Sequence, residues 1–367
     1  MKNNGILFLC NTPYQILVAM WMKHKCFPDE NVDIIISDHM NGAENLCERM
    51  REYGQFRECY FVKSFAFSYH RVILSTGEKR LAQLVPSWFI RRFINLKYRY
   101  KTVFLANVDK FSALLFNALK GAELFLFEDG LSTYSNSIIQ AYESNYNRMP
   151  EMDRLHFIFH RFFFREQKIY GSIKKAYLFN PEIAVWDDYF EKEKIPYIDE
   201  NDYPFKEMCN KLFDYSDSSE YDRKYIFMEE SFVADGYEIN DVEIVEKISD
   251  LIGKDNIIVK IHPRNPENRF EKLGYKTNHN ISIPWEVIAM NLSENDEKIL
   301  VTISSACILN PLMIFNKRIK AYALLKCVDQ YELNRTLTSG TLRQLIISLY
   351  EKYYPTVIIC NSVNEVV

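Results

Sequence analysis

Glycine is scarce in this chain, with 11 among 367 residues. Neither the Gly-x-Gly-x-x-Gly fingerprint of dinucleotide-binding folds nor a Walker phosphate loop occurs. The sequence therefore disfavours the usual classes of nicotinamide and ATP enzymes. No stretch reaches the roughly 18 apolar residues that a membrane-spanning helix needs. No small-residue cleavage site follows the apolar segment 5–22, so we expect a soluble or peripheral protein.

The eight cysteines are scattered and none forms a Cys-x-x-Cys pair. This excludes the usual zinc knuckles and disulfide frameworks, and it favours a reducing, cytoplasmic compartment. The net charge is −4 and the isoelectric point is about 6.1. These values argue against nucleic acid as a partner.

Apolar strand patterns alternate with helical patterns in both halves of the chain. In the first half we expect strands at 6–10, 32–37, 103–106 and 124–127, with helices at 15–23, 43–53 and 111–119. In the second half we expect strands at 225–228, 257–260, 299–303 and 319–323, with helices at 242–251 and 306–315. This α/β pattern predicts parallel, doubly wound sheets.

The chain length and a change in composition predict two domains. Residues 198–223 are acidic and rich in turn formers. We place a first Rossmann-like domain at 1–180, a linker at 181–222 and a second Rossmann-like domain at 223–367. Two such domains with a cleft between them are typical of the GT-B fold.

Three polar clusters follow predicted strands, where ligands bind in open α/β sheets. They are Lys260-Ile261-His262-Pro263-Arg264, Glu128-Asp129-Gly130 and Ser304-Ser305. We expect them to line one cleft that handles an anionic, phosphate-bearing substrate. The alternative for His262 is a structural role in capping its strand.

Two basic and aromatic segments, 88–101 and 156–175, suit an anionic membrane surface. The alternative is a solvated helix face that covers core aromatics. We expect contact with the inner face of the membrane as one hypothesis and a homodimer as another.

Five short motifs in order resemble those of the bacterial lipooligosaccharide and capsule sialyltransferases of glycosyltransferase family 52. They are Asn11-Thr12-Pro13-Tyr14-Gln15, Glu128-Asp129-Gly130, His262-Pro263-Arg264, Ile283-Pro284-Trp285-Glu286 and Ser304-Ser305. The resemblance implies a first domain on the acceptor side and a second domain that binds the nucleotide sugar.

The resemblance also implies CMP-sialic acid as donor, inversion at the anomeric carbon and a terminal sugar such as galactose as acceptor. Ser304 and Ser305 would receive the phosphate at a helix start, and Glu286 would hold the ribose. His262 would donate to the departing phosphate, while Lys260 would approach the cytosine or the phosphate. Pro263 and Arg264 complete that motif, and Thr12 and Gln15 would line the cleft or cap the first helix. No Asp-x-Asp motif occurs, so we expect no essential metal and no cofactor other than the donor.

Three carboxylates compete as the general base that deprotonates the acceptor. Asp235 is preferred, because the family's catalytic carboxylate lies in a loop of the second domain. Asp129 is the second choice, or it organises an Asp-Gly turn with Gly130, and Glu230 is the third. Alternatives for the function are a CDP-glycerol polymerase type of enzyme and a non-catalytic protein of capsule assembly.

Overall fold

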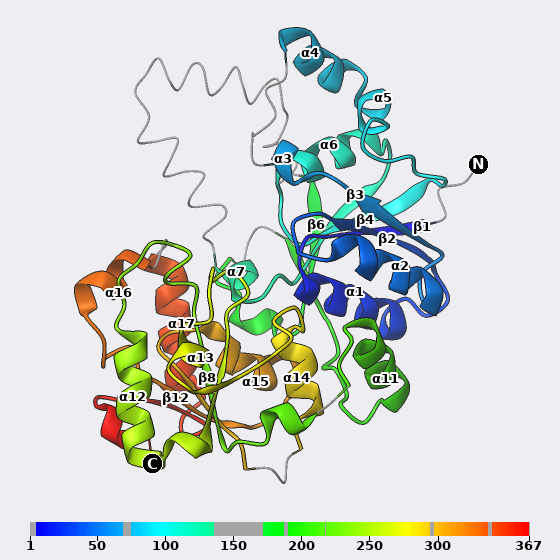
Figure 1. The fold of residues 1–367 in the computed structure, drawn as a ribbon. Helices are drawn as coiled ribbons and strands as arrows, with labels where there is room; N and C mark the ends of the chain where they lie inside the picture. Colours follow the sequence, from blue (N-terminus) through cyan, green and yellow to red (C-terminus); the bar gives the residue numbers. More distant parts are fainter. Residues whose placement is uncertain are drawn as a thin grey trace. The chain divides into compact units, whose positions relative to one another are not determined.

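The computed structural model describes residues 5–68, 75–135, 172–186, 190–216, 218–293, 297–336 and 340–366. The chain divides into two compact units, unit 1 (Met1–Pro196) and unit 2 (Tyr197–Val367). Each unit contains one β-sheet with helices around it (Figure 1). In the described part of the chain, no helix combines the length and the apolar character needed to cross a membrane.

Unit 1 holds a seven-stranded sheet in the order β3-β2-β1-β4-β5-β6-β7, and neighbouring strands are parallel. Its strands are β1 (Gly5–Cys10), β2 (Asn31–Ser37), β3 (Glu58–Val62), β4 (Tyr100–Leu105), β5 (Glu123–Phe127), β6 (Ile173–Leu178) and β7 (Glu191–Lys194). The strand order reverses between β1 and β4, which is the position where doubly wound sheets bind ligands.

The helices of unit 1 alternate with the strands, as the crossover connections of a parallel sheet require. They are α1 (Pro13–Lys25), α2 (Ala43–Tyr53), α3 (Phe65–Ser68), α4 (Thr76–Leu84), α5 (Pro86–Ile90), α6 (Lys110–Ala118), α7 (Leu131–Tyr134) and the 3₁₀ turn η1 (Pro181–Ile183). The first crossover helix begins sharply: Thr12 caps α1 by accepting a 3.2 Å hydrogen bond from the N–H of Gln15, and Pro13 occupies the first helical position.

Unit 2 holds a six-stranded parallel sheet in the order β10-β9-β8-β11-β12-β13, which reverses between β8 and β11. Its strands are β8 (Tyr225–Met228), β9 (Ile257–Lys260), β10 (Lys276–Thr277), β11 (Ile299–Thr302), β12 (Lys320–Ala323) and β13 (Val357–Ile359). Its helices are α11 (Tyr203–Leu212), α12 (Asp241–Ile252), α13 (Arg269–Lys272), α14 (Trp285–Asn291), α15 (Asn310–Phe315), α16 (Gln330–Thr336) and α17 (Gly340–Lys352). The 3₁₀ turns are η2 (Ser218–Tyr221), η3 (Lys254–Asn256), η5 (Ala306–Leu309) and η6 (Val363–Glu365).

The central strands are buried along their whole length, as expected for parallel strands covered on both faces. All residues of β1, β8, β9 and β11 are buried. Aromatic side chains fill much of unit 1: the rings of Phe8 and Phe104 stack at 4.5 Å, and Phe127 meets Phe8 edge-on at 5.4 Å. This packing accounts for part of the high aromatic content.

The strands and helices predicted from the sequence are present, with shifts of a few residues at their ends. One predicted element differs: the helix expected at 306–315 is divided into the 3₁₀ turn η5 and the short helix α15. Asn310, followed by Pro311, begins α15, and proline at an early helical position favours a new start.

The division between the units falls between Pro196 and Tyr197, within the segment 181–222 that the sequence assigned to a linker. The described residues of that segment contribute elements to both units. β7 pairs with β6 in the first sheet, and α11 belongs to unit 2. The basic segment 156–175 lies outside the described residues apart from its last four positions.

Candidate functional site

Each sheet carries a group of polar side chains where its central strands end. In unit 1 the group comprises Asn11, Gln15, Asn107 and Asp129, here called the amide–aspartate cluster. In unit 2 it comprises Lys260, His262 and Glu286 with their partners, here called the β9 cluster. The amide–aspartate cluster lies beside the point where the strand order reverses, between β1 and β4, whereas the β9 cluster is one strand away from the reversal between β8 and β11.

Asp129 is the carboxylate of the amide–aspartate cluster. Gln15 Nε2 donates to its Oδ1 at 2.7 Å, and Asn107 Nδ2 lies 3.4 Å from its Oδ2. Gln15 is oriented in turn, because its Oε1 accepts a 2.6 Å hydrogen bond from the N–H of Asn11. Burial raises the pKa of Asp129, while the two amides counteract part of that shift. The arrangement holds a half-buried carboxylate in one orientation.

Gly130 follows Asp129 with φ of 69° and ψ of −160°. This backbone conformation is essentially restricted to glycine. It lets the chain turn from β5 into α7, and the N–H of Asp129 donates to Thr133 Oγ1 at 2.7 Å within that turn. The role of Gly130 is therefore to shape the backbone that presents Asp129.

Glu128 lies next to Asp129 but is buried in a different set of contacts, at 1% exposure. It accepts hydrogen bonds from Tyr14 Oη at 2.7 Å, from the N–H of Phe179 at 2.9 Å and from Tyr134 Oη. Burial raises its pKa to about 7. Because these hydrogen bonds connect the end of β5 with the end of β6, we assign a structural role to Glu128.

His262 follows β9 and is partly buried. Its Nδ1 accepts a 3.2 Å hydrogen bond from the N–H of Arg264, so the neutral ring carries its proton on Nε2. Burial lowers its pKa to about 4, with further lowering by the charges of Arg264 and Lys260. The ring is therefore neutral at pH 7 and offers Nε2–H as a donor.

Lys260 and Glu286 place opposite charges in a buried setting, each with 7% exposure. Burial lowers the pKa of Lys260 and raises that of Glu286, and each charge opposes the shift of the other. Asn310 Nδ2 donates to Glu286 Oε1 at 2.6 Å. Within the described part of the chain, Lys260 Nζ has no hydrogen-bond partner, so its three donors are available to a ligand.

Glu229 positions the loop that carries His262. Its Oε2 accepts a 2.8 Å hydrogen bond from the N–H of His262, and its Oε1 accepts one from Arg269 Nη2 at 3.0 Å. Arg269 also pairs with Asp241 at 2.6 Å. This buried network connects the ends of β8 and β9 with α12 and α13.

The serine pair is engaged with protein groups. Ser304 donates its N–H and its hydroxyl to Glu230, at 2.7 and 2.8 Å. Ser305 caps η5, with its Oγ accepting from the N–H of Cys307 at 3.3 Å. Burial raises the pKa of Glu230. A phosphate at Ser304 would have to replace Glu230, and the role of the pair as phosphate ligands stays a prediction.

Asp235 occupies an exposed turn after β8. Arg264 donates to both of its oxygens, at 3.0 and 3.2 Å, and Ser231 Oγ donates at 2.7 Å. The side chain of Asp235 is 35% exposed and that of Arg264 is 62% exposed, and Pro263 is exposed beside it. Asp235 thus lies in an ion pair near the surface.

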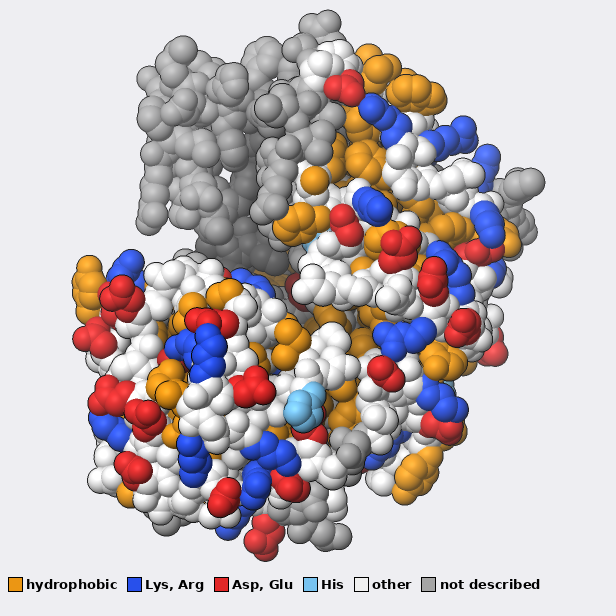
Figure 2. Space-filling view, viewed as in Figure 1, with side chains coloured by type: hydrophobic (Ala, Val, Ile, Leu, Met, Phe, Trp, Pro, Cys, Tyr) orange, Lys and Arg blue, Asp and Glu red, His pale blue; other side chains and the backbone are white. Residues whose placement is uncertain are grey.

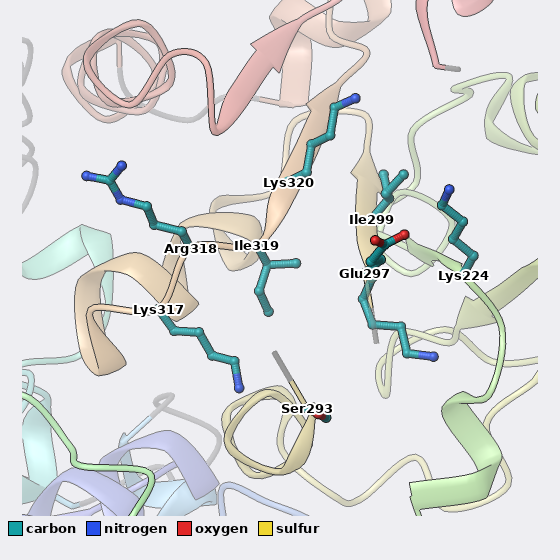
Figure 3. A pocket seen from close by; sticks show the side chains of 9 residues that line it. Lys224, Ser293, Glu297, Ile299, Lys317, Arg318, Ile319 and Lys320 are labelled. Atoms are coloured by element: carbon teal, nitrogen blue, oxygen red, sulfur yellow. The ribbon is translucent and has the colours of Figure 1, made fainter. Parts of the chain in front are cut away.

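A pocket of about 330 Å³ lies at the opposite, amino-terminal edge of the unit 2 sheet. It is lined by basic residues that include Lys224, Arg318 and Lys320. Figure 3 shows Arg318 and Lys320 pointing away from each other, so these two cations do not converge on one ligand position. This pocket is separate from the β9 cluster.

Three partners in these clusters were not singled out from the sequence: Asn107, Arg269 and Asn310. Asn107 comes two residues after β4, so the rule that ligands bind at strand ends could have identified it. Arg269 and Asn310 lie in helices far along the chain from their partners, and no local pattern marks them. Among the described residues, no three His, Cys, Asp or Glu side chains are grouped as metal ligands would be.

Known protein structures of similar fold include two glycosyltransferases. The calicheamicin glycosyltransferase CalG4 has a TM-score of 0.51 and 10% identity, over 100% of this chain and 89% of that one. The kitacinnamycin glycotransferase has a TM-score of 0.50 and 8% identity, over 99% and 87%. These similarities confirm the predicted GT-B fold.

The sequence comparisons are more specific about the family. No curated protein sequence matched this chain. A family model described as Alpha-2,8-polysialyltransferase (POLYST) matches residues 6–323. This match supports the sialyltransferase prediction, while the more specific assignment to glycosyltransferase family 52 stays a prediction. The chain belongs to the alpha-2,8-polysialyltransferase family.

Proposed function

We propose that the protein is an inverting sialyltransferase that uses CMP-sialic acid and binds this donor in unit 2. The observation that carries the proposal is the β9 cluster. There a neutral His262 lies at the same strand end as the buried ammonium of Lys260. The carboxylate of Glu286 interacts electrostatically with that ammonium. A nucleoside monophosphate needs these groups: cations and donors for one phosphate, and a carboxylate for the ribose.

The leaving group is CMP, and negative charge grows on its phosphate as the bond to the anomeric carbon breaks. His262 Nε2–H would donate to that phosphate. A phosphate dianion beside the ring would raise the low pKa of His262 and so favour proton transfer. Lys260 would add a positive charge in a buried setting, where Coulomb attraction is stronger than in water.

The general base is better supported as Asp129 than as Asp235, the first choice from the sequence. Asp129 is held by Gln15 and Asn107, and burial raises its pKa towards the operating range of a base. Both oxygens of Asp235 are already engaged by Arg264, and Ser231 donates to one of them. The role of Glu230 as base is less favourable, because Ser304 and Thr302 already donate to its oxygens.

Two acceptors compete. The sequence resemblance suggested galactose, whereas the family is described as Alpha-2,8-polysialyltransferase, and transfer that builds polysialic acid needs a terminal sialic acid as acceptor. We propose terminal sialic acid as the acceptor and metal-independent transfer in the cytoplasm.

The test supplies the purified protein with CMP-sialic acid or CDP-glycerol and with glycans ending in galactose or sialic acid. We expect CMP release and a ladder of sialylated products only with CMP-sialic acid and the sialylated acceptor. Addition of a single sialic acid to the galactose-terminated glycan would show that galactose, the acceptor expected from the sequence, is the correct one. Turnover of CDP-glycerol, or no turnover and no binding of CMP, would overturn the proposal.

A further inference from the structure

Helices α4 and α5 carry large apolar side chains on the protein surface. Leu81, Leu84, Val85 and Trp88 are 42%, 79%, 43% and 52% exposed. They lie within eight consecutive residues around the junction of the two helices, where Val85 leaves the helical conformation with φ of −133° and ψ of 61°. Figure 2 shows apolar side chains next to Lys and Arg side chains over α4 and α5, at the upper right of the view.

The inner side of the same segment is fixed to unit 1. Phe89 and Ile90 are 1% and 5% exposed, and Phe89 packs against Phe67 with ring centroids 6.2 Å apart. Arg92 donates to Glu78 at 3.0 Å and so ties the start of α4 to the end of α5. The outer apolar residues are therefore held in place on an anchored support.

Basic side chains lie next to the apolar ones in this region (Figure 2). Of the five cations in 88–101, Arg92, Lys97 and Lys101 are paired with glutamates. Arg91 and Arg99 are exposed and make no ion pair with the described residues. Both line a pocket of about 430 Å³ beside α5, and no carboxylate is among its lining residues.

We propose that the α4–α5 surface docks on a bilayer that contains anionic lipids, with Leu84 and Trp88 entering the interface and Arg91 and Arg99 contacting lipid phosphates. Exposed apolar side chains flanked by arginine are typical of segments that bind the membrane interface, and tryptophan favours the headgroup region. The absence of carboxylates from the pocket lining provides charge complementarity to a phosphate. This inference is independent of the proposed sialyl transfer.

Tryptophan fluorescence gives a direct test, because Trp88 is the exposed member of four tryptophans. Trp21, Trp186 and Trp285 are 1%, 4% and 5% exposed. Vesicles of phosphatidylcholine with phosphatidylglycerol should shift the emission of the full chain to shorter wavelength. Trp88→Phe should abolish the shift while sedimentation with the vesicles persists.

Sedimentation with vesicles tests the surface itself. Leu84→Ser combined with Trp88→Ser should weaken binding about tenfold or more. Arg91→Glu combined with Arg99→Glu should weaken it at least about fivefold per position at low salt. The matched controls Leu251→Ser (45% exposed, on α12) and Arg318→Glu (exposed, in unit 2) should bind like the wild type.

Thermal unfolding of each variant shows whether it is folded, so that a loss of vesicle binding can be distinguished from a loss of structure. Equal binding to neutral vesicles would overturn the role of the arginines. Absence of binding by the folded wild type, or unchanged binding by the Leu84 and Trp88 double variant, would overturn the docking surface and leave a protein partner as its occupant.

Discussion

Gln15 Nε2 donates a 2.7 Å hydrogen bond to Asp129 Oδ1, which joins the start of α1 to the end of β5. The two residues are 114 positions apart in the chain. The contact orients the proposed base, so Gln15 is a positioning residue. Thr12 has a different role, because its side chain caps α1.

Asp129→Asn should lower the turnover number by about 10²–10⁴-fold, as is typical for loss of a general base, with little change in CMP affinity. Asp235→Asn is the matched variant. It should lose little turnover, because Asp235 is not the proposed base, and its exposed ion pair with Arg264 contributes only about 0–1 kcal/mol to stability. Steady-state kinetics and CMP titration measure both. If Asp235→Asn abolished turnover while Asp129→Asn stayed near the wild type, the base would belong to unit 2.

His262→Ala should lower both turnover and CMP affinity, since the ring is proposed to contact the leaving phosphate. His262→Gln keeps a side-chain N–H donor and should retain more CMP affinity than His262→Ala. Turnover should stay low in both variants, because an amide cannot supply a proton. Calorimetric titration with CMP separates the two effects. Wild-type turnover in His262→Gln would restrict the role of His262 to hydrogen bonding.

Glu286→Gln should weaken CMP binding about 10–100-fold, which corresponds to a charged hydrogen bond of about 1.5–3 kcal/mol. The affinity for 2′-deoxy-CMP should change less, because the lost partner is the ribose hydroxyl. Parallel titrations with the two nucleotides measure this difference. Equal losses for both would mean that Glu286 acts through the charge of Lys260 and not through the ribose.

Glu128 should make the protein less stable as pH rises. Its pKa is about 7 in the folded state against an ordinary value of 4.5, so the folded chain holds a proton that the unfolded chain has lost between these pH values. The free energy of unfolding therefore falls by about 3 kcal/mol as pH rises from 4.5 to 7.

Urea unfolding at pH 5 and pH 8 measures this contribution. Glu128→Gln, which cannot titrate, should remove it, whereas Glu246→Gln on the exposed face of α12 should not. An identical pH dependence in wild type and Glu128→Gln would contradict the raised pKa.

Chelation of metal ions should leave sialyl transfer intact. We propose that protein groups alone, namely His262, Lys260 and the serine pair, stabilise the charge of the single phosphate. Turnover is measured before and after treatment with EDTA, with calcium-loaded EDTA as control. Loss of turnover that magnesium or manganese restores would show that a metal takes part.

The sequence by itself determined which segments form the central strands and which polar residues follow them. Buried parallel strands are continuous apolar runs, and turn residues mark their ends, so local pattern was sufficient for β8, β9 and β11. Strands with weaker patterns, such as the two-residue β10 and the charged β7 (Glu-Lys-Glu-Lys), depend on a neighbouring strand for their pairing and were not predicted.

Only the tertiary structure decided how these polar residues pair. Asp129 is joined by Asn107 and Gln15, whereas Asp235 is joined by Arg264, and this contrast changed the preferred base. Such contacts depend on burial and on packing between residues far apart in the chain, which also determine pKa shifts. The exposure of Leu84 depends in the same way on what the rest of unit 1 leaves uncovered, because an apolar residue at a helical position is equally compatible with a core.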